Sequence, residues 1–148
     1  MIFLINRKES HLVLEGKTFY YNSGKDFTSL RCWKDAREVK IFFYQQILPK
    51  LPSSEKNNLD IQIRKAACSI TANIAEGHGR FHYKEAIQFY RIARGSLSEL
   101  KDHIISCGDL GYICEKITKL GIEKIEKAKI SLNGFINYNS EKIKKSTG

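Results

Sequence analysis

Hydrophobic positions recur every three or four residues through most of the chain, which is the period of one face of an α-helix. Four such stretches occur, over about residues 29–48, 54–76, 83–110 and 112–136. The connections between them are short, and short connections between long amphipathic helices favour antiparallel neighbours. The pattern therefore predicts an all-α fold, an up-down-up-down antiparallel four-helix bundle, over residues 25–139.

Local signals indicate where these helices begin and end. Thr28 or Ser29 is expected to cap the first helix by accepting a hydrogen bond from an N–H of its first turn, and Pro49 should stop it. Gly77 is expected to end the second helix in the left-handed conformation that glycine adopts without penalty. Gly95 lies inside the third helix, where glycine costs about 1 kcal/mol relative to alanine, so we expect a close helix–helix crossing there.

The apolar stripes of the four helices predict the core, and Trp33 lies on the stripe of the first helix. Other large apolar side chains fall off the main stripes, and an apolar face outside the core should be covered by something. We therefore expect these residues to contribute to a subunit interface: Phe42, Tyr44, Ile87 and Tyr90.

The two ends of the chain depart from the helical pattern. Residues 1–24 are expected to form a non-helical extension, and the β-branched, aromatic and aliphatic residues over 11–14 and 18–21 leave a short hairpin and a disordered segment both open. Residues 140–148 are expected to be a polar tail that frays. The apolar run over residues 2–5 is too short for a secretory signal, and no apolar run approaches the roughly 18 residues of a membrane span.

Charge and cysteine content narrow the expected partners and compartment. The 148 residues include 25 Lys and Arg against 16 Asp and Glu, a net charge of +9. This excess favours polyanionic partners, above all RNA or DNA. Cys32, Cys68, Cys107 and Cys114 form no CxxC pair, so we expect reduced thiols that act as small hydrophobes. Reduced thiols in turn point to the cytoplasm.

Three sequence strings are more specific than the periodicity. They are LRCWKDA over residues 30–36, QIRKAACSITANIAEGHGR over residues 62–80 and ARGSLSEL over residues 93–100. In this order the strings resemble the bacterial four-helix-bundle proteins encoded in intervening sequences of 23S ribosomal RNA genes. The resemblance covers roughly residues 27–135.

The resemblance implies a four-helix bundle that assembles into a ring-shaped homopentamer and has no established enzymatic activity. A related branch is the accessory protein of diversity-generating retroelements, which binds a reverse transcriptase and nucleic acid. Two functions are therefore expected. One is a homo-oligomer that binds RNA or DNA through a basic surface, and the other is a scaffold that recruits a protein partner such as a reverse transcriptase.

Basic residues at or beside the motif positions are the candidate nucleic-acid contacts. A side-chain cation that neutralises a phosphate releases counterions, whereas an arginine near a helix end can satisfy backbone carbonyls or pair with Glu76 or Glu99. Both interpretations are open for Arg64 and Arg80. The candidates are Arg64, Lys65, Arg80, Arg91 and Arg94.

The remaining motif residues are expected to have structural roles. Asn73 should hold the connection over residues 77–82 by hydrogen bonds from its side chain to the backbone. No second carboxylate or nucleophile accompanies Glu76, and the histidines do not supply a full set of metal ligands, so we expect no catalysis, no metal and no other cofactor. The residues assigned to structural roles are Trp33, Asn73, Glu76, Gly77, Gly95 and Glu99.

Overall fold

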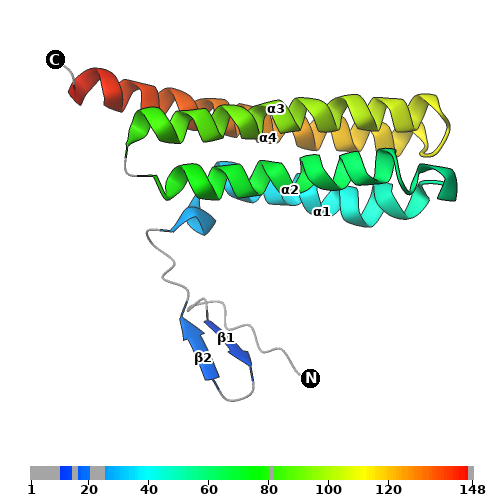
Figure 1. Ribbon diagram of the computed structural model, residues 1–148, viewed down its shortest axis with the longest axis horizontal. Helices are drawn as coiled ribbons and strands as arrows, with labels where there is room; N and C mark the ends of the chain where they lie inside the picture. Colours follow the sequence, from blue (N-terminus) through cyan, green and yellow to red (C-terminus); the bar gives the residue numbers. More distant parts are fainter. Residues whose placement is uncertain (1–10, 15–16, 21–25, 81, 147–148) are drawn as a thin grey trace.

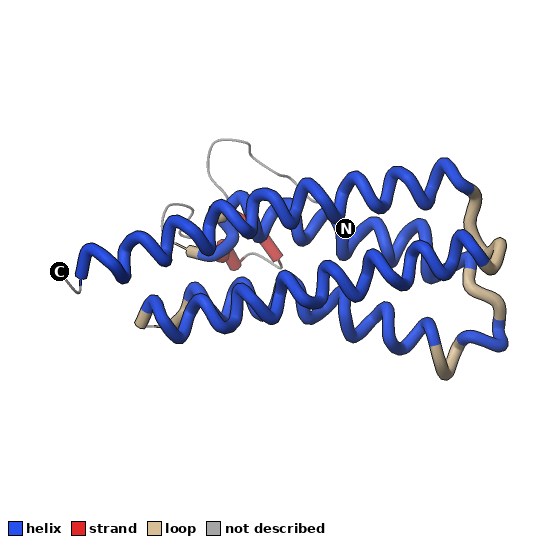
Figure 2. The backbone as a smooth tube through the Cα atoms, turned by 90° about the horizontal axis from the view of Figure 1, so that it is seen from above, coloured by secondary structure: helices blue, strands red, loops and turns tan. Residues whose placement is uncertain are grey.

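A computed structural model describes residues 11–14, 17–20, 26–80 and 82–146 of the chain. Four long helices lie side by side in it (Figures 1 and 2). Each helix packs against two others, α1 and α3 both lying between α2 and α4. The predicted all-α, up-down-up-down four-helix bundle is therefore confirmed. The helices are α1 (Arg31–Phe42), α2 (Leu59–His78), α3 (Tyr83–Asp109) and α4 (Glu115–Ser146).

Two short strands precede the helices. The strands β1 (His11–Leu14) and β2 (Lys17–Tyr20) pair antiparallel, with His11 opposite Tyr20. The sequence pattern left a hairpin and a disordered segment open, and these described residues form a hairpin. The first helical turn among the described residues is the 3₁₀ turn Phe27–Ser29.

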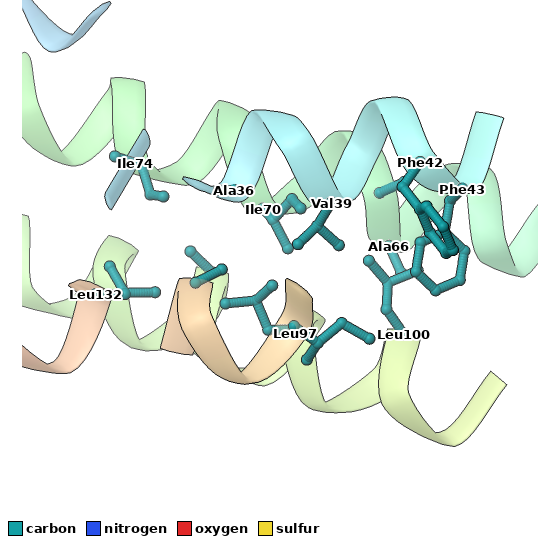
Figure 3. Packing of buried hydrophobic residues seen from close by; sticks show 14 of the residues in the cluster. Ala36, Val39, Phe42, Phe43, Ala66, Ile70, Ile74, Leu97, Leu100 and Leu132 are labelled. Atoms are coloured by element: carbon teal, nitrogen blue, oxygen red, sulfur yellow. The ribbon is translucent and has the colours of Figure 1, made fainter. Parts of the chain in front are cut away.

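The predicted stripes meet in one core between the four helices (Figure 3). Periodicity identifies this core because residues three and four apart share a helix face. Trp33 is an exception, since it is only half-buried at the start of α1, where its ring meets that of Phe27 edge-on at 5.3 Å. Fully buried stripe residues include Ala36, Val39, Ile63, Ile70, Ile74, Leu97, Leu100, Ile125 and Leu132.

The off-stripe residues expected at a subunit interface belong mostly to the core of the single chain, so that expectation is wrong for three of the four. Phe42 and Phe43 follow buried Val39 by three and four residues, so both share its inward face, and both are buried. After Phe42 the helix widens into a π-helical stretch, Phe43–Ile47. Ile87 and Tyr90 are buried as well. Only Tyr44 stays half-buried.

The start of α1 differs from the prediction. Neither Thr28 nor Ser29 caps it: Leu30 is the N-cap residue and makes no side-chain hydrogen bond to the helix. The polar side chain acts one turn earlier, where the Asp26 carboxylate accepts a hydrogen bond from the backbone N–H of Thr28. The side-chain cap that the sequence suggested for α1 is therefore found on the preceding 3₁₀ turn, and Asp26 provides it. Downstream, Pro49 lies in a 3₁₀ turn that follows the π-helical stretch, in agreement with its expected role as a stop.

Gly77 lies inside α2 and is buried, so the expectation that it ends the helix in a left-handed conformation is wrong. Its role is the close approach of α3. A Cβ at this position would lie 2.5 Å from Cε1 of Tyr90 and 3.0 Å from the carbonyl oxygen of Ala86. The missing side chain is therefore what allows the Tyr90 ring to lie against the backbone of α2.

Gly95 does not mark the expected helix crossing. It is exposed on α3, and a Cβ built there would meet nothing within 4 Å. The packing of the chain does not explain a glycine at this position. The close approach lies instead at Gly121 of α4, where a Cβ would collide with Ile104 and stand 2.8 Å from Cε1 of Phe42.

The polar tail expected over residues 140–148 is helical as far as Ser146. The apolar period continues past the predicted end of the helix, because Ile136 and Asn139 are buried and Ile143 packs on the core. These contacts supply the tertiary support that a polar helix end lacks alone. As a result α4 runs alongside the first turns of α3.

All four cysteines are free thiols. Burial raises the pKa of both Cys32 and Cys107 to about 11, so these two are neutral, apolar members of the core. Cys68 and Cys114 are exposed. Among the described residues, no helix combines the length and the apolar character needed to cross a membrane.

The two helix-interior glycines provide a matched test of this packing. Gly77→Ala should lower the free energy of unfolding by about 1–3 kcal/mol, because the new methyl group overpacks the site against Tyr90. Gly95→Ala should raise it by about 0.5–1 kcal/mol, because alanine restricts the unfolded chain and meets open space in the folded one. Urea denaturation of both variants at one protein concentration measures the difference. Equal effects would contradict the assigned helix packing.

Candidate nucleic-acid interface

Four of the five basic candidates lie on α2 and α3, the fifth, Arg80, lies in the connection between them, and the five do not form one cluster. Arg64 precedes the end of α2 at His78 by 14 residues, or about 21 Å of helix axis. Arg80 follows that end, and Arg91 and Arg94 lie in the first half of α3. Each position must therefore be judged by its own contacts.

Arg64 is held by contacts within the chain. Its Nε lies 2.6 Å from Oδ1 of Asp60, one turn earlier on α2. The guanidinium carbon also lies 5.2 Å from the centroid of the Tyr44 ring on the neighbouring π-helical stretch. A phosphate would have to compete with both contacts, so Arg64 is better suited to joining the first two helices. Lys65 beside it is exposed and forms no ion pair with any described residue.

Arg80 clamps the connection between α2 and α3. Its guanidinium pairs with Glu76 of α2 and donates a 3.1 Å hydrogen bond to Glu85 of α3. The same group lies 4.7 Å from the centroid of the Phe89 ring. The ion pair with Glu76 is one that the sequence left open. Glu99, the other suggested partner, lies 3.4 Å from Nε2 of His103 instead.

Asn73 does not hold the connection after α2, so that prediction is wrong. Its side-chain nitrogen donates to the backbone oxygen of Ser69 at 2.8 Å and to the Ser69 hydroxyl at 2.9 Å, one turn earlier in the same helix. The Ser96 hydroxyl of α3 donates to the same Ser69 oxygen at 2.8 Å. The asparagine thus extends a polar contact between α2 and α3. The prediction failed because α2 continues through Gly77 to His78, so the connection begins farther from Asn73 than the sequence suggested.

A basic groove lies between the start of α3 and the end of α4. Its volume is about 360 Å³, and its lining contains three cations and no carboxylate. Lys84 and Arg91 form no ion pair with any described residue, while Lys144 also contacts Glu141 at 2.8 Å. The residues from α3 are Lys84, Ile87, Gln88 and Arg91, and those from α4 are Ser140, Ile143 and Lys144.

Positive charge continues from this groove along the contact between the two helices. Nη1 of Arg94 donates to the side-chain oxygen of Asn133 on α4 at 3.2 Å, a neutral partner that leaves the charge uncompensated. Farther along, Lys101 lies 2.7 Å from Glu126. Hydrogen bonding to that lysine is the main cause of the lowered pKa of Glu126. We use the name basic seam for Lys84, Arg91, Arg94 and Lys144.

The seam has the dimensions of a short phosphate track. Lys84 and Arg94 are ten residues apart, or about 15 Å along α3. One strand of a duplex rises about 3.4 Å per phosphate, so this length matches about four phosphates. Lys84 and Lys144 were not among the predicted contacts. The sequence does contain a signal for Lys144: the neighbouring Ile143 continues the helical spacing of apolar residues beyond the predicted end of the last helix.

A second hollow lies between α1 and α4, and we name it the α1–α4 groove. Its volume is about 890 Å³, and its surface is almost entirely apolar. Exposed Ile130 and Tyr138 of α4 form part of its wall, while Asp35 of α1 contributes a buried carboxylate. The part of the chain that the structure describes contains no group of three or more His, Cys, Asp or Glu side chains that could hold a metal ion.

Comparison with protein families gives one match. Residues 28–134 match the family described as 23S rRNA-intervening sequence protein. A comparison with curated proteins gave no match. The family match covers well over half of the chain and all four helices, so the chain belongs to the 23S rRNA-intervening sequence protein family. The match ends before the last three turns of α4, which include Ser140 and Lys144 of the basic seam's groove.

The contacts of Arg80 and Arg91 predict opposite effects of the same substitution. Arg80→Ala should lower the free energy of unfolding by about 1 kcal/mol, because it removes two exposed ion pairs and one cation–ring contact. Arg91→Ala should change it by less than about 0.5 kcal/mol, because no described group depends on that side chain. Urea denaturation of the two variants checks this. A larger loss for Arg91→Ala would show that Arg91 has a structural role.

Proposed function

We propose that this protein is a non-enzymatic homo-oligomer, a ring of five chains, that binds RNA or DNA through the basic seam. The observation that carries the proposal is the groove in which Lys84 and Arg91 face solvent without a carboxylate partner in the described part of the chain. A cation without a partner can contact a phosphate at no loss of an existing ion pair. Arg64 and Arg80 lack this advantage.

The chemistry of the seam favours phosphate contacts over base recognition. Cationic side chains that contact phosphates release counterions and position the nucleic acid, but they carry no sequence information. Gln88 and Ser140 in the groove add neutral hydrogen-bonding groups. The proposed binding is therefore largely independent of sequence and strongly dependent on salt. The net charge of +9 supports it by raising the local concentration of polyanions.

The absence of catalysis is also part of the proposal. Arg80 pairs with both the motif carboxylate Glu76 and the second carboxylate Glu85, so one cation serves the two. Oε1 of Glu99 lies 3.4 Å from Nε2 of His103, one turn later on the same helix. The ion pairs of Arg80 join α2 to α3, which favours a structural role for Glu76 over general acid–base catalysis.

The proposed ring needs an apolar surface that is not already buried within the chain. Phe42, Ile87 and Tyr90 are unavailable for this role because they lie in the core. Ile92 on α3 remains available instead, since it is 51% exposed. Burial of such side chains by a neighbouring copy would contribute about 25 cal/mol per Å² before the costs of association.

The second candidate function is a scaffold that recruits a protein partner such as a reverse transcriptase. The α1–α4 groove favours it, because an apolar hollow of about 890 Å³ is suited to protein side chains and not to phosphates. A purified reverse transcriptase from the same genome distinguishes the two functions. Binding that is lost in Ile130→Asp and unchanged in Lys84→Ala with Arg91→Ala would favour the scaffold.

Removal of the two unpaired cations tests the nucleic-acid proposal. Lys84→Ala with Arg91→Ala should weaken binding to a fluorescent single-stranded RNA. Its plot of log affinity against log salt should become shallower by about 1.4, or about 0.7 for each lost phosphate contact. The control is Lys34→Ala with Arg37→Ala on α1, which removes the same charge outside the seam. Fluorescence anisotropy over a range of salt concentrations measures the slopes. Equal slopes for the two double variants would refute the seam.

Light scattering tests the ring. The chain should have a mass close to five times 17.0 kDa. Ile92→Glu should shift the mass towards a single chain, because it places a charge in the proposed apolar interface. Leu120→Glu on α4 is the matched control and should leave the mass unchanged. A monodisperse species of one chain for the unaltered protein would exclude the oligomer.

A further inference from the structure

The α1–α4 groove is an apolar surface that the described helices leave open. Ile130 is 73% exposed and Tyr138 is 57% exposed, although both lie on the helix that packs against α1. Leu30 and Phe135 line the same hollow. Apolar patches of this kind on a folded chain mark places where another segment or molecule binds.

The charged residues of the groove indicate what its occupant must provide. Asp35 is only 6% exposed, and its Oδ2, which solvent does not reach, accepts no hydrogen bond from a described residue. Lys127 Nζ lies 3.3 Å from the other oxygen, and Arg31 Nε lies 3.8 Å from Oδ2, which is too far for a hydrogen bond. Three carboxylates line the groove, those of Asp35, Glu123 and Glu126, against two cations, Arg31 and Lys127. The groove therefore favours an occupant that combines apolar side chains with positive charge.

We propose that residues 1–10 of the same chain bind in the α1–α4 groove. These residues, MIFLINRKES, lie outside the described part of the structure. Ile2, Phe3, Leu4 and Ile5 supply the apolar side chains that cover Ile130 and its neighbours. The following Arg7 and Lys8 complement the negative charges of Glu123 and Glu126 at the groove.

The hairpin register places the start of this segment beside the point where the chain continues towards α1. Because His11 pairs with Tyr20, residue 10 begins at the same end of the hairpin from which the chain continues to α1. Phe27 packs on Trp33, and Leu30 lines the groove, so the chain enters the bundle at the groove itself. The tether between the hairpin and the groove is therefore short.

The lengths of chain are sufficient. The seven residues from Tyr20 to Phe27 span at most about 24 Å, and ten extended residues span at most about 35 Å. The groove extends from Ile122 to Tyr138 on α4, or about 24 Å of helix axis. Residues 2–5 can therefore reach any part of it.

Tethering favours this segment over a second copy of the protein. A short linker gives an attached segment an effective concentration in the millimolar range. A second copy at micromolar concentration would need to bind about a thousand times more tightly to occupy half of the grooves. The proposal is independent of nucleic-acid binding, since the groove and the basic seam share no residue.

Disulfide trapping tests the contact in the full chain. The background is Cys68→Ser with Cys114→Ser, which removes both exposed thiols. Leu4→Cys with Ile130→Cys should form a disulfide within one chain under mild oxidation, mapped by peptide mass spectrometry. Leu4→Cys with Ile61→Cys on α2 is the control and should form at least tenfold less. A disulfide between two chains, no disulfide, or equal yields for the two pairs would overturn the proposal.

Exposure of the groove provides a second readout that needs no cysteine. Ile2→Ser with Leu4→Ser should increase the fluorescence of a dye that binds apolar surfaces by severalfold, because it uncovers Ile130 and Phe135. The RNA affinity and its salt slope should not change, so failure of this proposal is distinguishable from failure of the proposed function. Circular dichroism confirms that the variant is folded. Unchanged dye binding in the folded variant would overturn the proposal.

Discussion

The packing of the Tyr90 ring against the backbone of α2 at Gly77 is the contact on which the arrangement of the bundle depends. A side chain at that position would occupy the space of the ring, so only glycine allows α2 and α3 to lie this close. Gly121 plays the same part on α4, where it admits Ile104 and Phe42. Interiors are close-packed, so these two positions determine how the surrounding core side chains meet.

The same close packing determines which residues remain for function. Large side chains that the sequence left available for an interface lie in the core, Phe42 on the same face of α1 as Val39 and Tyr90 against Gly77. The outer surface is left with long cations and scattered aliphatic side chains. Some cations pair with carboxylates and join helices, as Arg80 does, whereas Lys84 and Arg91 have no carboxylate partner among the described residues and lie together where α3 meets the end of α4.

The sequence predicts the four helices and most of the core because the spacing of apolar residues is a property of each helix alone. That spacing does not show which residues of two different helices meet. Gly77 has the signature of a helix end, and only the position of Tyr90 on another helix shows that it is a packing site. Asn73 likewise binds within its own helix because the connection begins later than the glycine suggested. The basic groove was missed for a related reason, since Lys144 belongs to turns whose polar sequence favours fraying when the support of α3 is not known.

The residues of the basic seam come from two parts of the chain that differ in their relation to the family match. Lys84, Arg91 and Arg94 lie within the residues that match the family, whereas Lys144 lies beyond them, on turns of α4 that pack against α3 through Ile143. A helix end of this kind is ordered only while its apolar residues find a partner, because polar helices of a few turns are marginal in water. The groove between the two helices therefore depends on packing at Ile143 as much as on its cations. Charge alone would place the positive residues on the surface, and it is the docked end of α4 that brings them together as one binding surface.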